Sequence, residues 1–147
     1  EHVANPEEIL KECRRVLKPG GRLYINFPPY YHPYGAHLSD AIGIPWVHFF
    51  FNENTLIEVY KELVSKLPDE QERIKLRISK DGSGCEYISY INKMTIARFQ
   101  KILENADFSI DYYREVPLRK FLAFTSRIPV IKEGFVKMVV CVLKKPE

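Results

Sequence analysis

The sequence predicts an α/β fold, in which amphipathic helices alternate with the strands of a buried sheet. Three observations lead to this prediction. An amphipathic segment opens near residue 5 and ends at the K-P-G-G run of residues 18–21. A short run at residues 23–27 follows that turn directly and is apolar on both faces, as in a strand buried inside a sheet. Residues 135–143 form the segment richest in β-formers, which predicts a central strand.

The first helix is predicted from its capping residues and its apolar spacing. Asn5 suits the N-cap, Pro6 the first helical position, and the two glutamates that follow suit the positive end of the helix dipole. One apolar stripe recurs at helical spacing and contains Ile9, Leu10, Cys13, Val16 and Leu17. The K-P-G-G run ends the helix, because proline breaks it and glycine accepts a positive φ.

The middle of the chain is predicted to combine a long ordered loop, a helix and a hairpin. Residues 30–51 lose both the helical and the strand period. A helix is expected over residues 54–67, capped by Asn52 or Asn54. A β-hairpin is expected where residues 73–80 and 85–91 flank a D-G-S-G turn, because apolar and basic residues alternate before that turn.

The C-terminal third is predicted to hold a helix and then two strands. Thr95 suits the N-cap of an amphipathic helix. Phe108, Ile110 and Tyr112 then alternate with polar residues, which predicts a strand before the one at residues 135–143.

Composition predicts one folded domain over residues 1–147, because a chain of this length with 46% hydrophobic residues can build a core. The 22 basic residues exceed the 19 acidic ones by only three and are scattered, so no nucleic-acid partner is expected. Three separated cysteines predict reduced thiols and a cytoplasmic protein. The longest apolar run, residues 139–143, is far too short to cross a bilayer, so no membrane partner is expected.

Two segments of the chain resemble class I S-adenosylmethionine-dependent methyltransferases. The run R-V-L-K-P-G-G-R-L at residues 15–23 resembles the R-V-L-K-P-G-G-x-L signature of that family, and E-H-V followed by Pro6 resembles the segment after its fourth strand. The resemblance implies the C-terminal half of a Rossmann-like methyltransferase sheet. In that half the fifth strand follows K-P-G-G, and the last strand inserts between the fifth and the sixth as part of an antiparallel pair. Residues 28–92 are then an insertion with a helix and a β-hairpin, predicted to act as a substrate lid.

The resemblance also implies S-adenosylmethionine as cofactor, bound mainly by a glycine-rich turn and an acidic residue that this sequence lacks. The G-x-G at Gly82 and Gly84 has Tyr87 where a third glycine belongs and is expected in a hairpin, so it is interpreted as a turn. Glu1 and His2 are implied to lie beside the methyl donor or the acceptor; alternatively, both simply fray at the start of the chain. Because the chain begins with Glu1 and not Met, it is expected to be a piece of a longer protein. Because it lacks the glycine-rich turn, this substrate-side fragment is expected to have little activity alone.

The loop after the first predicted strand is the expected acceptor site, because ligands of open α/β sheets bind beyond the carboxyl ends of the strands. His37 or His32 suits the role of the base that takes a proton from the methyl acceptor, with Asp40 fixing the tautomer. The side chains expected to line the acceptor pocket are Tyr30, Tyr31, Tyr34, Trp46 and His48. Alternatively, these histidines cap loop backbone groups and the aromatic rings pack the lid. No metal is expected, because the His and Asp spacing matches no standard ligand motif.

Two functions of different class remain open. The first is a small-molecule methyltransferase, active in its full-length form. The alternative is a non-catalytic, methyltransferase-like interaction module. Without the first four strands of the family's sheet, one edge of the strand at residues 23–27 would be open, which predicts self-association through that edge.

Overall fold

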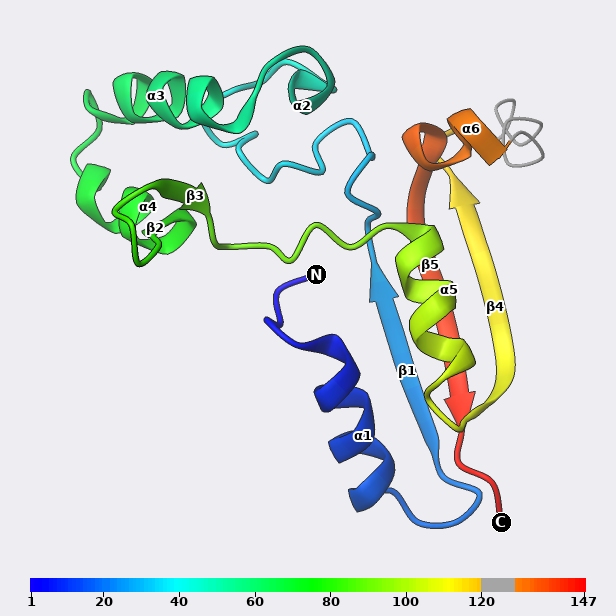
Figure 1. Cartoon of the computed structure of the whole chain (residues 1–147). Helices are drawn as coiled ribbons and strands as arrows, with labels where there is room; N and C mark the ends of the chain where they lie inside the picture. The colour runs from blue at the N-terminus through cyan, green and yellow to red at the C-terminus, as the bar shows by residue number, and fades with distance from the viewer. Residues whose placement is uncertain (120–128) are drawn as a thin grey trace.

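The computed structural model describes residues 1–119 and 129–147, and it has an α/β fold with two antiparallel sheets (Figure 1). The helices and strands are, in chain order, α1 (Pro6–Val16), β1 (Arg22–Phe27), α2 (Val47–Phe50), α3 (Glu53–Val64), α4 (Glu70–Arg77), β2 (Ile78–Lys80), β3 (Glu86–Ile88), α5 (Ile96–Glu104), β4 (Ser109–Pro117), α6 (Pro129–Lys132), the 3-10 turn η2 (Glu133–Phe135) and β5 (Val136–Lys144). No helix in the described part of the chain is long and apolar enough to span a membrane.

Helix α1 begins and ends where the sequence predicts. The Asn5 side chain accepts a hydrogen bond from the backbone N–H of Glu8 at 3.3 Å, and Pro6 is the first helical residue. In the K-P-G-G turn that follows, Gly20 has a φ of +71°, which favours glycine. Its N–H donates to the carbonyl of Lys145 at 3.0 Å, so the turn is tied to the end of the last strand.

The larger sheet has the strand order β1-β5-β4, and β5 is antiparallel to both neighbours. In this register Val142 lies between Tyr24 of β1 and Tyr112 of β4. The predicted central strand is therefore confirmed. Its alternating burial, with Val139, Cys141 and Leu143 all 0% exposed, shows that one face of β5 points into the core.

Strand β1 differs from its prediction, because only one of its faces is covered. Leu23, Ile25 and Phe27 turn toward the core, whereas Tyr24 is 60% exposed. Asn26 is exposed on the same side as Tyr24. The run L-Y-I-N-F thus alternates with the period of a strand that has one solvated face, and the prediction of burial on both faces was wrong.

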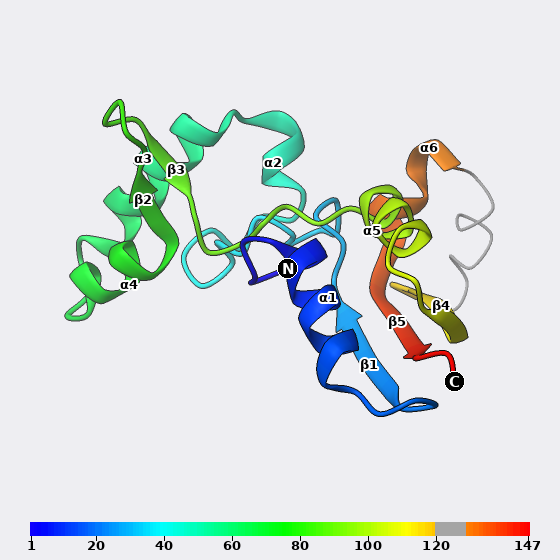
Figure 2. The ribbon, with the colours of Figure 1, turned by 60° about the horizontal axis from the view of Figure 1, so that its bottom comes forward.

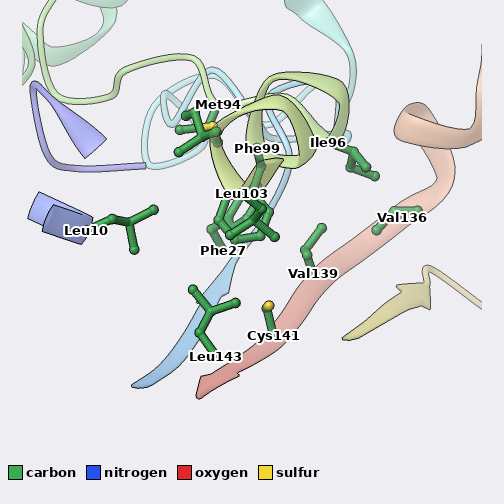
Figure 3. Close-up of a cluster of buried hydrophobic side chains, with 11 residues drawn as sticks. Leu10, Phe27, Met94, Ile96, Phe99, Leu103, Val136, Val139, Cys141 and Leu143 are labelled. Carbon is green, nitrogen blue, oxygen red and sulfur yellow. The ribbon is translucent and has the colours of Figure 1, made fainter. Parts of the chain in front are cut away.

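The core of the sheet lies between its covered face and helices α1 and α5 (Figure 3). Leu10 of α1 and Phe99 and Leu103 of α5 pack in one cluster with Phe27 and with the inward residues of β5. Helix α5 starts at its predicted N-cap, where Thr95 Oγ1 accepts from the N–H of Arg98 at 3.0 Å. Helix α5 therefore buries its apolar stripe against the sheet. Of the stripe predicted for α1 only Leu10 is buried, since Ile9 is 47% and Val16 is 67% exposed.

The insertion, residues 28–92, forms a second body beside the sheet (Figures 1 and 2). It has an apolar cluster of its own, to which α3 contributes Leu56, Ile57, Tyr60 and Val64. Asn52 is the N-cap of α3, one of the two residues predicted for this role. The insertion begins close to where it ends, because the N–H of Tyr30 donates to the carbonyl of Met94 at 2.7 Å.

The predicted hairpin is present but shorter than expected. Only β2 and β3 pair, with Ile78 opposite Ile88, and residues 70–77 form α4. The alternation of apolar and basic residues in that segment suggested a strand, but Asp69 and Arg73 form an ion pair one helical turn apart, at 2.8 Å. The prediction of a strand from residue 73 was therefore wrong, whereas the D-G-S-G segment does form a turn before β3.

Candidate functional site

The loop after β1 folds back sharply beyond the end of that strand. Gly35 makes this fold possible, because a Cβ atom there would lie 1.7 Å from the carbonyl oxygen of Tyr30. Backbone hydrogen bonds from His32 to Pro29 and from Gly35 to His32 hold the turns. His37 has a φ of 55°, a left-handed conformation that is uncommon for a residue with a Cβ. The loop thus holds its histidines in a defined and partly strained backbone.

A pocket of about 320 Å³ lies in this loop. Its lining residues are Pro28, His32, Tyr34, His37, Ser39, Asp40, Arg77 and Tyr90. We call it the His37 pocket. All three residues that the sequence suggested as catalytic line it, together with one of the predicted substrate-binding tyrosines. The sequence did not single out Arg77 or Tyr90, because they come from α4 and from the segment after β3.

His37 is neutral at physiological pH. Burial, and then the nearby His2, N-terminal ammonium, His32 and Arg77, together lower the pKa of its imidazole to about 4. Its ring meets that of His2 edge to face, with 5.2 Å between centroids, and lies 5.9 Å from the ring of Tyr90. A neutral imidazole in a pocket can accept a proton from a bound molecule.

Asp40 does not play the predicted part of orienting a histidine. Its Oδ2 atom accepts a hydrogen bond from the Tyr60 hydroxyl at 3.0 Å and lies 2.7 Å from Arg73 and 3.2 Å from Arg77. Burial, followed by the hydrogen bond to Asp40, raises the pKa of Tyr60 to about 12. The carboxylate therefore links α3 to α4 beneath the pocket, where charge pairing with two guanidinium groups outweighs contact with a neutral imidazole.

His32 combines a pocket position with a structural contact. Its Nδ1 atom accepts a hydrogen bond from the backbone N–H of Tyr34 at 3.2 Å, so the alternative in which histidines cap loop backbone groups holds for this residue. Burial, and then the positive charge of Lys137, lower its pKa. The tautomer of His32 is thus set by the loop itself, with Nδ1 unprotonated.

Three of the predicted substrate-binding residues pack against one another outside the His37 pocket. The ring of His48 lies 4.9 Å from that of Tyr30, and Tyr31 stacks on Phe49 at 5.3 Å. Neither ring nitrogen of His48 has a hydrogen-bond partner in the described part of the chain, and burial lowers its pKa to about 4. These contacts match the alternative in which the rings pack the lid.

Trp46 lines a second and larger pocket, of about 520 Å³, that adjoins the first. The two pockets share His32 and Tyr34. The indole N–H of Trp46 donates to the carbonyl of Gly134 at 3.3 Å, which joins the insertion to the turn before β5. We call this cavity the Trp46 pocket.

Glu1 and His2 are held by hydrogen bonds. The Nδ1 atom of His2 lies 2.9 Å from the carbonyl of Tyr90, its Nε2 lies 3.2 Å from a Glu1 carboxylate oxygen, and the Glu1 carbonyl accepts from the N–H of Asn92 at 2.7 Å. This argues against the alternative in which both residues fray. The two side chains line different pockets, of about 220 Å³ for Glu1 and about 330 Å³ for His2.

Metal ligation has no support in residues 1–119 and 129–147. Within these ranges no three His, Cys, Asp or Glu side chains gather in a group that could hold a metal ion.

The chain is similar to known methyltransferases. The family model described as a methyltransferase domain matches residues 1–25. Ubiquinone biosynthesis O-methyltransferases from several strains of Coxiella burnetii are 27% identical over 114 residues, which is 76% of this chain and 43% of each relative. The matched part of the chain therefore spans less than half the length of these relatives.

A solved structure is also similar over most of the chain. A SAM-dependent methyltransferase from Methanosarcina mazei is 21% identical, with a TM-score of 0.40, and the match covers 99% of this chain and 54% of that protein. The family match includes the K-P-G-G segment that carries the resemblance in the sequence. The family match and the curated relatives thus support the resemblance to class I S-adenosylmethionine-dependent methyltransferases.

Proposed function

We propose that this chain forms the acceptor-binding side of a S-adenosylmethionine-dependent methyltransferase that acts on a small molecule. In this proposal β1, β4 and β5 are the fifth, sixth and last strands of a Rossmann-like sheet, and the insertion is the lid over the acceptor. The relation to methyltransferases supports the reaction class. The antiparallel β5 between β1 and β4 supports the position of these strands in the sheet.

The contact between His2 and His37 is the observation that carries this proposal. The two residues were assigned by separate arguments, His2 to the cofactor side by resemblance and His37 to the acceptor side by its place beyond β1. Their rings nevertheless lie 5.2 Å apart. Methyl transfer requires donor and acceptor to meet in one place, so this proximity is what the proposed function needs.

The proposed roles follow from the chemistry of the His37 pocket. The cofactor, when bound, supplies an electrophilic methyl group. The acceptor enters through the pocket, and the neutral imidazole of His37 takes the proton that the acceptor loses. Tyr34 and Tyr90 flank the acceptor, and Arg77 is held in place by Asp40. The low pKa keeps His37 unprotonated throughout the physiological range.

The fit of the cofactor to these residues is incomplete. Glu1 and His2 line two separate pockets, and the one that contains Glu1, at about 220 Å³, is below the roughly 300 Å³ of ordinary ligand pockets. Within the described residues there is thus no cofactor-sized cavity shared by both. We propose that residues 1–2 contribute one wall of the site and that the glycine-rich turn and acidic residue implied by the family resemblance hold most of the cofactor.

Calorimetry with S-adenosylmethionine on the complete product of the gene that encodes this chain tests the proposal. We expect binding there and little or none by residues 1–147 alone. In the complete protein, His37→Gln should keep cofactor binding and lower kcat at least about 100-fold. Lys75→Gln, an exposed change on α4, is the control that should leave kcat unchanged. A complete protein that does not bind the cofactor would contradict the enzyme and favour a non-catalytic, methyltransferase-like module.

We also propose that residues 1–147 self-associate through β1. This strand pairs with β5 on one side, and no strand in the described part of the chain pairs with its other side. Beside that open edge, Leu23, Ile25 and Phe27 line an apolar groove with α1. An unpaired edge next to apolar surface favours pairing with a second copy. Sedimentation at high concentration should show dimers, and a clean monomer would contradict this.

A further inference from the structure

The Trp46 pocket has a composition that differs from that of the His37 pocket. Its walls are three aromatic rings, from Tyr34, Trp46 and Phe135, two cationic side chains, from Arg119 and Lys137, and the imidazole of His32. No acidic residue is among the lining residues that the structure describes. Aromatic walls with convergent charges of one sign are typical of a site for a planar ion of the opposite sign.

Hydrogen bonds position Trp46 and the backbone of Phe135. The N–H of Trp46 donates to the carbonyl of Pro33 at 2.6 Å, and its indole N–H donates to Gly134. The Trp46 and Phe135 rings lie 6.0 Å apart, and the carbonyl of Phe135 accepts from Leu118 at 2.8 Å. Rings that are held in this way bind a planar molecule with little loss of side-chain entropy.

Within the described residues, no carboxylate pairs with the positive charge of this pocket as Asp40 does in the neighbouring one. Arg77 of the His37 pocket pairs with Asp40. In contrast, the ion pairs formed among residues 1–119 and 129–147 include neither Arg119 nor Lys137. Lys137 is close enough to lower the pKa of His32. An anion in the pocket would therefore meet two cations without displacing an existing carboxylate.

We propose that the Trp46 pocket binds the carboxylate end of a planar aromatic acceptor, whose other end reaches His37. This inference rests on the proposed function, because it names the class of acceptor that the same site takes. The shared residues His32 and Tyr34 join the two pockets, so one molecule can occupy both. The guanidinium of Arg119 and the ammonium of Lys137 bind the carboxylate, and Trp46 stacks on the ring.

The fluorescence of Trp46 tests this directly, because it is the single tryptophan of the chain. Benzoate and benzamide have nearly the same shape and differ in charge. We expect benzoate to quench the fluorescence of the full 147-residue chain with a half-saturation concentration about tenfold below that of benzamide. Equal quenching by the two, or none by benzoate, would overturn the proposal.

Two variants test whether the preference for benzoate over benzamide arises from the cations of the Trp46 pocket. Lys137→Gln and Arg119→Gln should each weaken benzoate binding several-fold and leave benzamide binding unchanged; both side chains are exposed, so the fold should persist. Lys11→Gln, an exposed change on α1, is the matched control and should change neither. If Lys11→Gln weakens benzoate binding as much as Lys137→Gln does, the preference reflects overall charge and the proposal fails.

The benzoate experiment tests the Trp46 pocket independently of whether the complete gene product transfers a methyl group. Binding of benzoate by this chain, without methyl transfer by the complete gene product, would support the pocket and contradict the proposed function. Methyl transfer to acceptors that carry no charge, with equal kcat/KM for an acid and its amide, would support the proposed function and contradict the carboxylate site.

Discussion

The sheet and the insertion are both built around apolar clusters, but they differ in the polar groups that pack beside those clusters. Beneath the sheet, the cluster of α1, α5 and β5 consists of apolar side chains and one thiol. In the insertion, Tyr60 is fully buried and donates to Asp40, which also pairs with Arg73 and Arg77. An apolar core tolerates substitutions that keep its volume, whereas a hydrogen-bonded network holds its side chains in one geometry. The insertion is therefore the part that positions the site.

The largest effect of a single substitution is expected in the sheet. Leu143 is 0% exposed, so Leu143→Ala should lower the free energy of unfolding by about 3 kcal/mol through lost burial and a residual cavity. Urea denaturation measures this change. Leu63→Ala on α3, where the side chain is 43% exposed, is the control and should cost less than about 1 kcal/mol. Equal losses in the two variants would break the comparison.

Asp40→Asn should be the most damaging polar change in the insertion. It leaves the Arg77 guanidinium, 15% exposed, without its carboxylate, and we expect a cost of about 2 kcal/mol, reduced from the fully buried case because Asp40 itself is 24% exposed. Denaturation and hydrogen exchange in α3 and α4 measure it. Asp69→Asn removes only the more exposed partner of Arg73 and should be clearly milder. A cost for Asp40→Asn no greater than that of Asp69→Asn would argue against a network.

The insertion should also respond to acid. Burial lowers the pKa values of His37 and His48 from 6.5 to about 4, so the folded chain binds fewer protons than the unfolded chain between these values. The free energy of unfolding should therefore fall as pH drops from 6.5 toward 4, by at most about 1.4 kcal/mol per pH unit for each histidine. Urea denaturation across this range measures the slope. His48→Phe, which keeps the ring stack, should flatten it, and a slope unchanged by that variant would exclude His48 as a cause.

Removal of a helix N-cap should give the smallest effect, and the sheet and the insertion offer a matched pair of caps. Thr95→Ala removes the cap of α5 under the sheet, and Asn52→Ala removes that of α3 in the insertion, where Asn52 accepts from Thr55 at 2.9 Å. Each should cost about 1 kcal/mol. Hydrogen exchange should show that amide protection falls across the sheet for Thr95→Ala and only within the insertion for Asn52→Ala. Spreading of both effects over the whole chain would mean that the two parts unfold together.

Local signals explain what the sequence could predict of this fold. Asn5, Thr95 and the K-P-G-G run lie within a few residues of the helix ends they mark, so their roles are readable without a structure. Helix α4 was missed because its apolar and basic residues also fit a strand. The i, i+4 pair of Asp69 and Arg73 was the available signal for a helix there.

The residues of the candidate site also divide into those that local sequence signals could predict and those that they could not. His32, His37 and Asp40 lie on one loop, within nine residues of one another. Because they are close in the sequence, their grouping around one pocket could be predicted from it. The partner of Asp40 could not be predicted in this way, since Arg73 lies 33 residues further along the chain. Lys137 reaches the Trp46 pocket from β5, a position that only the folded chain defines.

The hydrogen bond between Tyr30 and Met94 brings the start and the end of the insertion to neighbouring points on the sheet. Such a junction makes the insertion exchangeable as a cassette. A short turn or an unrelated lobe could join the same two points without shifting the register of β1 against β5. Under the proposed function, evolution could therefore change the acceptor by swapping this segment, while the sheet and its core are inherited unchanged.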